Sequence, residues 1–81
     1  MVTSEQIKMA RAALGWSVSK LAENCEVGVR TINRIEAQTG LPTATQANQK
    51  LIRTTLEAAG IEFIGDATEG PGVRLWNKPQ P

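Results

Sequence analysis

The chain has 81 residues, of which 41% are hydrophobic, with one cysteine, no histidine and a net charge of +1. This length suits one small domain, whose core rarely contributes more than about 3–5 kcal/mol by itself, so we expect dimerisation to add stability. A single cysteine excludes an intramolecular disulfide, and the absence of histidine removes the commonest general base and metal ligand. We therefore expect no metal, no other cofactor and no enzyme activity.

The charge is divided unevenly along the chain. Residues 1–53 carry seven basic and four acidic side chains, whereas residues 54–81 carry two basic and four acidic ones. The basic excess in the first part suits a polyanionic partner. No stretch resembles a signal peptide, and the apolar runs are too short to cross a bilayer. We expect a cytoplasmic, nucleoid-associated protein with no membrane partner and no small-molecule substrate.

The pattern predicts a first helix over about residues 4–14. Thr3-Ser4-Glu5-Gln6 fits a capping box, in which Thr3 is the N-cap and Gln6 reaches back to it. Gly15 ends the helix. Its apolar face consists of Ile7, Ala10 and Leu14.

Two short helices are predicted next, at about 18–24 and 29–37. Ser17 is a good N-cap for the first, and Gly28 is a weaker one for the second. Val27 lies in the turn between them. The residues at inward-facing spacing are Leu21, Ala22, Cys25, Ile32 and Ile35.

A longer helix is predicted at about 44–59, after a loop in which we expect Leu41 to enter the core. Either Thr43 or Thr45 caps this helix, and Gly60 follows its end. Its apolar residues form a broad predicted inner face: Ala47, Leu51, Ile52, Thr55, Leu56, Ala58 and Ala59.

The period then changes from 3.6 to 2, which predicts short strands at 61–64 and 72–76 and a flexible tail at 77–81. A two-stranded hairpin is marginal unless something covers it, and its edges invite pairing with another chain. The strands can pack on the long helix within one chain or pair between chains. We expect them to supply dimer contacts through Ile61, Phe63, Val73, Leu75 and Trp76; Trp76 can equally be an ordinary exposed strand residue.

Residues 14–36 carry the main functional signal. Two short amphipathic helices joined by a tight turn can place the second helix in the major groove of DNA. Ala22 leaves room for a close helix crossing, and Val27 fills the turn, so the outward residues are held in register. The candidate base contacts are Val29, Arg30, Asn33 and Arg34, and the candidate phosphate contacts are Ser17, Lys20, Gly28 and Thr31.

Each of these side chains has an alternative role. Arg30 and Arg34 lie one helical turn apart, and either can bind guanine O6 and N7 or contact only phosphates. Asn33 can bind adenine or a phosphate. Val29 can touch a thymine methyl or be an ordinary half-buried residue. Among the candidate phosphate contacts, the alternative for Ser17 is a role as a helix cap alone, and the alternative for Thr31 is packing against neighbouring residues.

These residues resemble the lambda-repressor-like helix-turn-helix proteins of the Cro/C1 (XRE) type, in a subgroup of small bacterial stand-alone regulators that also fits phage proteins. The family pattern is matched at Ser17, Leu21, Ala22, Val27, Thr31, Ile32, Ile35 and Glu36. The stretches Ala13 to Ser17 and Leu56 to Leu75 extend the resemblance over nearly the whole chain. It implies a mainly α, four- to five-helix DNA-binding domain at 1–60, followed by a C-terminal β-hairpin or dimerisation strands at 61–76.

Three positions depart from the family pattern. Val18 stands where the family usually has a phosphate-binding Gln, Glu26 replaces the usual turn Gly, and Gly28 replaces the usual Ser. At the position of the turn Gly, Glu26 has to adopt a positive φ, which costs a non-glycine residue of order 1 kcal/mol. The departures predict weaker DNA binding by a single copy and a dependence on pairing two copies.

The resemblance implies a sequence-specific transcriptional regulator, which acts as a repressor when it occupies a palindromic operator as a homodimer. An alternative is an antitoxin or other protein-interaction module with an autoregulatory helix-turn-helix, which the acidic C-terminal part leaves open.

Overall fold

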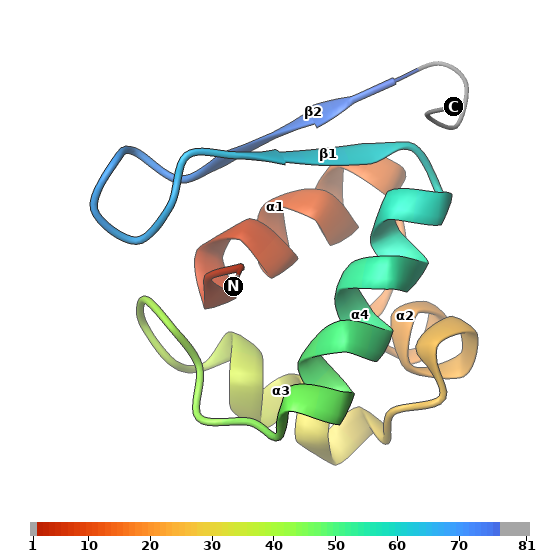
Figure 1. Cartoon of the computed structure of the whole chain (residues 1–81). Coiled ribbons are helices and arrows are strands. Elements are labelled where there is room, and N and C mark those ends of the chain that lie inside the picture. The colour runs from red at the N-terminus through yellow and green to blue at the C-terminus, as the bar shows by residue number, and fades with distance from the viewer. Residues whose placement is uncertain (1, 77–81) are drawn as a thin grey trace.

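The structure is a computed structural model that describes residues 2–76, and this range contains four helices and one two-stranded sheet. The elements are α1 (Ser4–Leu14), α2 (Val18–Cys25), α3 (Val29–Glu36), α4 (Gln46–Ala58), β1 (Ile61–Ile64) and β2 (Gly72–Leu75). The expected mainly α fold with C-terminal strands is confirmed. The sheet lies along one side of the helices, and α3 lies on the opposite side (Figure 1). The predicted tail at 77–81 falls outside the described residues.

Local side chains define the starts of the first two helices. The capping box is present in α1: Gln6 N–H donates to Thr3 Oγ1 at 3.0 Å, and Thr3 N–H donates to Gln6 Oε1 at 2.8 Å. Gly15 ends α1 in the left-handed conformation, at φ 69°. In α2, Ser17 Oγ accepts the N–H of Lys20 at 3.0 Å. Both α2 and α3 differ by one residue at the C-terminal end from the predicted ranges, because Cys25 is still helical and Ala37 is a C-cap.

Helix α4 is shorter than the predicted 44–59, and its inner face is narrower. Thr45 is the N-cap: its side chain accepts the N–H of Asn48 at 3.1 Å, so the helix starts at Gln46. Ile52 and Leu56 are 0% exposed, whereas Leu51 is 42% exposed. The prediction of a broad inner face is therefore wrong for Ala47, Leu51 and Ala58, which lie on the exposed side. Apolar residues occupy two sides of this helix, and the core covers only one of them.

The loop between α3 and α4 also departs from expectation. Leu41 is 52% exposed, and Pro42 is the buried residue instead. The loop is anchored one residue earlier, because Ser4 N–H donates to Gly40 O at 2.8 Å and Gly40 N–H donates to Glu5 Oε1 at 2.9 Å. Gly40 turns the chain there with φ 73°, and the Leu41 side chain remains outside the core.

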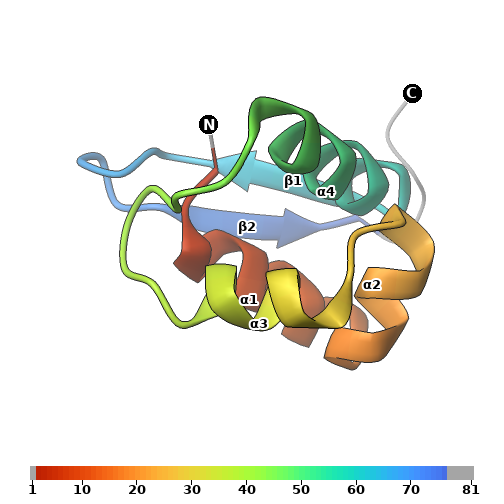
Figure 2. The same ribbon diagram turned by 90° about the horizontal axis from the view of Figure 1, so that it is seen from below.

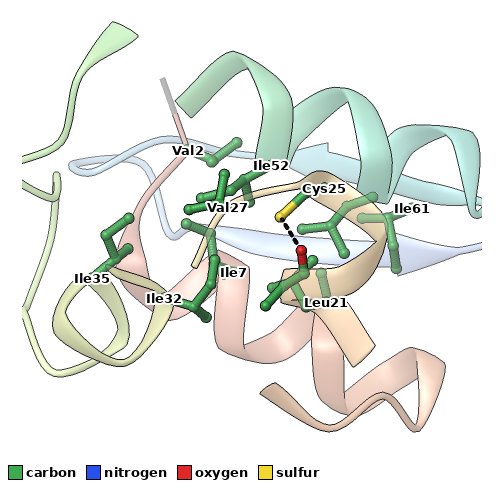
Figure 3. Packing of buried hydrophobic residues seen from close by; sticks show 12 residues of the cluster. Val2, Ile7, Leu21, Cys25, Val27, Ile32, Ile35, Ile52 and Ile61 are labelled. Carbon is green, nitrogen blue, oxygen red and sulfur yellow. Dashed lines mark hydrogen bonds between the residues drawn. The ribbon is translucent and has the colours of Figure 1, made fainter. Parts of the chain in front are cut away.

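The core is aliphatic and draws on every helix and on β1 (Figure 3). Its buried hydrophobic members are Val2, Ile7, Ala10, Leu21, Ala22, Cys25, Val27, Ile32, Ile35, Ile52, Leu56 and Ile61. The Cys25 thiol lies 3.9 Å from the carbonyl oxygen of Ala22, and burial raises the pKa of this thiol. Cys25 therefore serves as a small apolar core residue.

The two strands pair with each other within the chain. They run antiparallel, with Ile61 opposite Leu75 and Phe63 opposite Val73. Strand β1 lies against α4 and β2 against α1, so both helices cover the inner face of the sheet (Figure 2). Ile61 is only 1% exposed within its own chain, which makes it a core residue. Its side chain therefore offers a partner almost no surface, and the prediction of Ile61 as a dimer contact stays a prediction.

Candidate nucleic-acid interface

Helices α2 and α3 are joined by a tight turn over residues 26–28. Glu26 has φ 59° and ψ 32°, the left-handed conformation that usually favours glycine. Val27 is 5% exposed and joins the core, and Gly28 is the N-cap of α3 with no side-chain hydrogen bond. The turn therefore fixes the direction of α3 through one strained backbone position and one buried side chain.

The residues of α3 separate into two faces. Ile32 and Ile35 are 0% exposed and attach the helix to the core. The four candidate base contacts lie on the exposed side: Val29, Arg30, Asn33 and Arg34. Val29 is 43% exposed, so its alternative as a half-buried residue does not hold. Three polar side chains capable of contacting base edges thus project from a helix whose other side cannot move freely.

An ion pair holds the end of α3 against α1. Arg11 Nε lies 2.8 Å from Glu36 Oε2, and Arg11 Nη2 lies 2.8 Å from Glu36 Oε1. Arg11 Nη1 also donates to the carbonyl oxygen of Trp16 at 3.1 Å. The hydrogen bonds that Arg11 donates to the Glu36 carboxylate raise the pKa of the Arg11 guanidinium. Sequence reasoning missed this pair, because its members lie on different helices and no local period connects them.

The outward polar side chains of α3 differ in whether they form a hydrogen bond within the protein. The side chains of Arg30 and Asn33 have no hydrogen-bond partner within residues 2–76. Arg34 Nη1 donates to the carbonyl oxygen of Thr43, in the loop before α4, at 3.0 Å. Arg30 is consequently free to adapt to a ligand, whereas Arg34 already has a preferred direction.

The four candidate phosphate contacts lie at or within the first turns of two helices. Ser17 and Lys20 are exposed at the start of α2; the Ser17 hydroxyl accepts a backbone N–H and can still donate its proton. Gly28 and Thr31 stand at the start of α3, where Gly28 is exposed and Thr31 is half-buried. Free N–H groups at helix starts favour anions, so both positions suit a phosphate chain electrostatically.

Other site types find no support among the described residues. Residues 2–76 contain no group of three or more His, Cys, Asp or Glu side chains placed to hold a metal ion. Within the same range, no helix has the length and apolar character required to span a membrane.

Two short helices joined by a three-residue turn, the second of them with a basic outer face, define a helix-turn-helix DNA-binding domain. A family model described as "Helix-turn-helix" matches residues 7–48, slightly more than half of the chain, and the chain belongs to this family. The match runs from α1 into the start of α4, and the protein is a DNA-binding regulator. No curated protein and no solved structure gives a significant match to the chain.

Proposed function

We propose that the protein is a sequence-specific transcriptional repressor that binds a palindromic operator as a homodimer. Each α3 enters a major groove, where Arg30, Asn33 and Arg34 contact base edges and Val29 contacts a thymine methyl. Ser17, Lys20, Gly28 and Thr31 contact the neighbouring phosphates. By occupying the operator in the cytoplasm, at the nucleoid, the dimer blocks the promoter.

The observation that carries this proposal is the contrast between the two faces of α3. Its inner face is locked by Ile32 and Ile35, both 0% exposed, while Arg30 and Asn33 on its outer face have no intramolecular partner within the described chain. Discrimination between bases requires donors on a backbone that is held in register. An arginine left unpaired on such a helix suits an external acceptor.

The position of the sheet supports a dimer that leaves α3 accessible. The strands lie on the side of the molecule away from α3 (Figure 1), so a partner bound there does not cover α3. Each copy extends 29 Å along both of its longer axes. Two α3 helices reach half-sites one turn apart when they lie roughly 34 Å from each other, which is close to one such extent.

Four of the five proposed dimer residues retain exposed surface. Leu75 is 46% and Trp76 is 44% exposed, while Phe63 and Val73 are half-buried against the core. In the two-stranded sheet, each strand also has one edge without a strand partner. An edge of this kind pairs readily with the same edge of a second copy.

Selection of bound duplexes from a random pool tests the DNA-binding proposal. We expect the wild type to enrich a two-fold symmetric motif, and Arg30→Ala and Arg34→Ala each to lose preference at one base pair per half-site. Enrichment of no motif by the wild type, even at low salt, would contradict sequence-specific binding. If both variants keep the wild-type preferences, the arginines contact phosphates only.

Sedimentation of the full chain tests the dimer. We expect Leu75→Lys to dissociate the dimer, because burying the ammonium group in the strand contact costs its hydration free energy. Leu51→Lys is the matched control, since Leu51 is 42% exposed on α4 against 46% for Leu75. Dissociation by Leu51→Lys alone would move the interface to α4, and a wild-type monomer at all concentrations would refute the dimer.

A further inference from the structure

A ring of three hydrogen bonds joins the end of α3 to the loop before α4. Arg34 Nη1 donates to the carbonyl oxygen of Thr43 at 3.0 Å. The N–H of Thr43 donates to Gln38 Oε1 at 2.7 Å, and Gln38 Nε2 donates to the carbonyl oxygen of Arg34 at 3.2 Å. The Gln38 side-chain amide thus contacts both other members, one through each of its polar atoms.

The ring lies in exposed surroundings, and this limits what it contributes to folding. All three of its hydrogen bonds are solvent-exposed. Each of these bonds competes with hydrogen bonds to water. We therefore expect each to add only about 0.5 kcal/mol to the free energy of unfolding, the low end of what one hydrogen bond contributes. The larger effect is geometric, because the ring restricts the directions open to a long and otherwise flexible side chain.

The restricted guanidinium keeps a usable edge. Its bond to Thr43 uses one N–H of Nη1, and the N–H groups of Nε and Nη2 are not engaged by any residue in the described range. These two groups form a planar fork that fits guanine O6 and N7. Arg30 has the same fork but forms no hydrogen bond or ion pair within residues 2–76 that orients it.

We propose that Gln38 is a specificity-determining positioning residue: through Thr43 it orients Arg34 so that the Nε and Nη2 edge of this arginine reads one base pair in each half-site. This inference rests on the proposed function, since it requires base recognition by α3. Gln38 itself need not touch DNA. Arg34 then contacts its base pair in a preset orientation, whereas Arg30 adapts its orientation to the base pair that it contacts.

The test compares two variants of the full chain in the duplex selection, after Arg34→Ala has identified the base pair that depends on Arg34. Gln38→Met keeps the length of the side chain and removes its amide. We expect it to lower the preference at the Arg34-dependent base pair by about 3–10-fold, which is part of the value of one bidentate contact. Preference at the Arg30-dependent base pair and the salt dependence of binding should stay unchanged.

Thr43→Ala is the matched control, because Thr43 enters the ring only through its backbone N–H and carbonyl. We expect it to bind with wild-type preferences. An equal loss of preference at every base pair in Gln38→Met would mean a general structural role and would overturn the inference. So would unchanged preferences in this variant. If the wild type enriches no motif, the proposed function fails first, and this outcome is distinguishable from the other two.

Discussion

Arg11 and Glu36 form a two-point ion pair that joins the C-terminal parts of α1 and α3. Both nitrogen–oxygen distances are 2.8 Å, and the Glu36 side chain is 9% exposed against 24% for Arg11. The carboxylate therefore has little access to water and depends on the guanidinium for its hydrogen bonds. This pair holds the last turn of α3, where Arg34 begins its contact with the loop. The orientation of the recognition surface consequently depends on a residue of α1.

Removal of the two partners should have unequal effects. Arg11→Met leaves a nearly buried carboxylate unpaired and should lower the free energy of unfolding by about 2–3 kcal/mol. Glu36→Gln leaves the more exposed Arg11, which water can still reach, and should cost about 1–2 kcal/mol. Urea denaturation of both single variants and the double variant measures these values. We expect the double variant to lose at least about 1 kcal/mol less than the two single losses combined. Additive losses would show that the pair does not stabilise the fold.

Gln6 connects the start of α1 to the sheet. It is 1% exposed; its side-chain oxygen accepts the N–H of Thr3, and its nitrogen donates to the carbonyl oxygens of Ile64 and Gly72 at 2.9 and 3.1 Å. Gln6→Glu replaces the donor with an oxygen that faces two carbonyls. We expect this variant to lose at least about 2 kcal/mol of stability at pH 7.

The pH dependence of Gln6→Glu separates its charge from its shape. Burial and the two carbonyls favour the protonated acid, so the folded-state pKa of the new carboxyl should lie above its unfolded value. The stability of the variant relative to wild type should therefore be highest at acidic pH and decline as the pH rises through the folded-state pKa. Gln46→Glu, at an exposed position in the first turn of α4, is the control and should change stability little. A pH-independent difference between Gln6→Glu and wild type would contradict this explanation.

The sequence was sufficient for those parts of the fold in which one local pattern dominates. In α3, Ile32 and Ile35 are the only strongly apolar residues beside Val29, so the inner face follows from their spacing alone. The capping box of Thr3 and Gln6 and the strained turn at Glu26 are also local features, and the structure contains both. The exposed position of the candidate base contacts follows in turn from the assignment of the inner face.

The features that escaped prediction depend on distant residues. Helix α4 has apolar residues on two sides, and only the positions of α2 and β1 decide that Ile52 is buried and Leu51 is not. Leu41 is exposed because its neighbour Gly40 is bound by Ser4 and Glu5, more than thirty residues earlier. The ring through Gln38 needs a loop conformation that no periodicity encodes. Long-range hydrogen bonds of this kind leave no pattern in a single sequence.

The left-handed conformation of Glu26 predicts a stabilising substitution. Glu26→Gly removes the steric cost of φ 59°, partly offset by the greater freedom of glycine in the unfolded chain. We expect a net gain of about 0.5–1 kcal/mol and a rise in Tm of about 2–8 °C, measured by thermal denaturation. Glu23→Gly is the control, since it also removes one carboxylate but places glycine inside α2, where it should cost about 1 kcal/mol. A Tm that falls in both variants would show that the turn is not strained.

The carboxylate of Glu5 should make the attachment of the α3–α4 loop sensitive to acid. Hydrogen bonds from the backbone N–H of Glu5 and then from that of Gly40 lower its pKa from the ordinary value of 4.5. Because the folded-state pKa is the lower one, the ionised group stabilises the fold fully above its unfolded pKa, and this contribution is lost as the pH falls through the folded-state pKa.

Glu5→Gln should therefore be less stable than wild type at pH 7, and the difference should shrink as the pH falls below about 4.5. Asp66, whose pKa is lowered by the N–H of Thr68, adds a separate contribution in the hairpin turn that Asp66→Asn removes. Urea midpoints between pH 3 and 7 measure both effects. If the wild type and Glu5→Gln lose stability in parallel over this range, Glu5 does not anchor the loop through its charge.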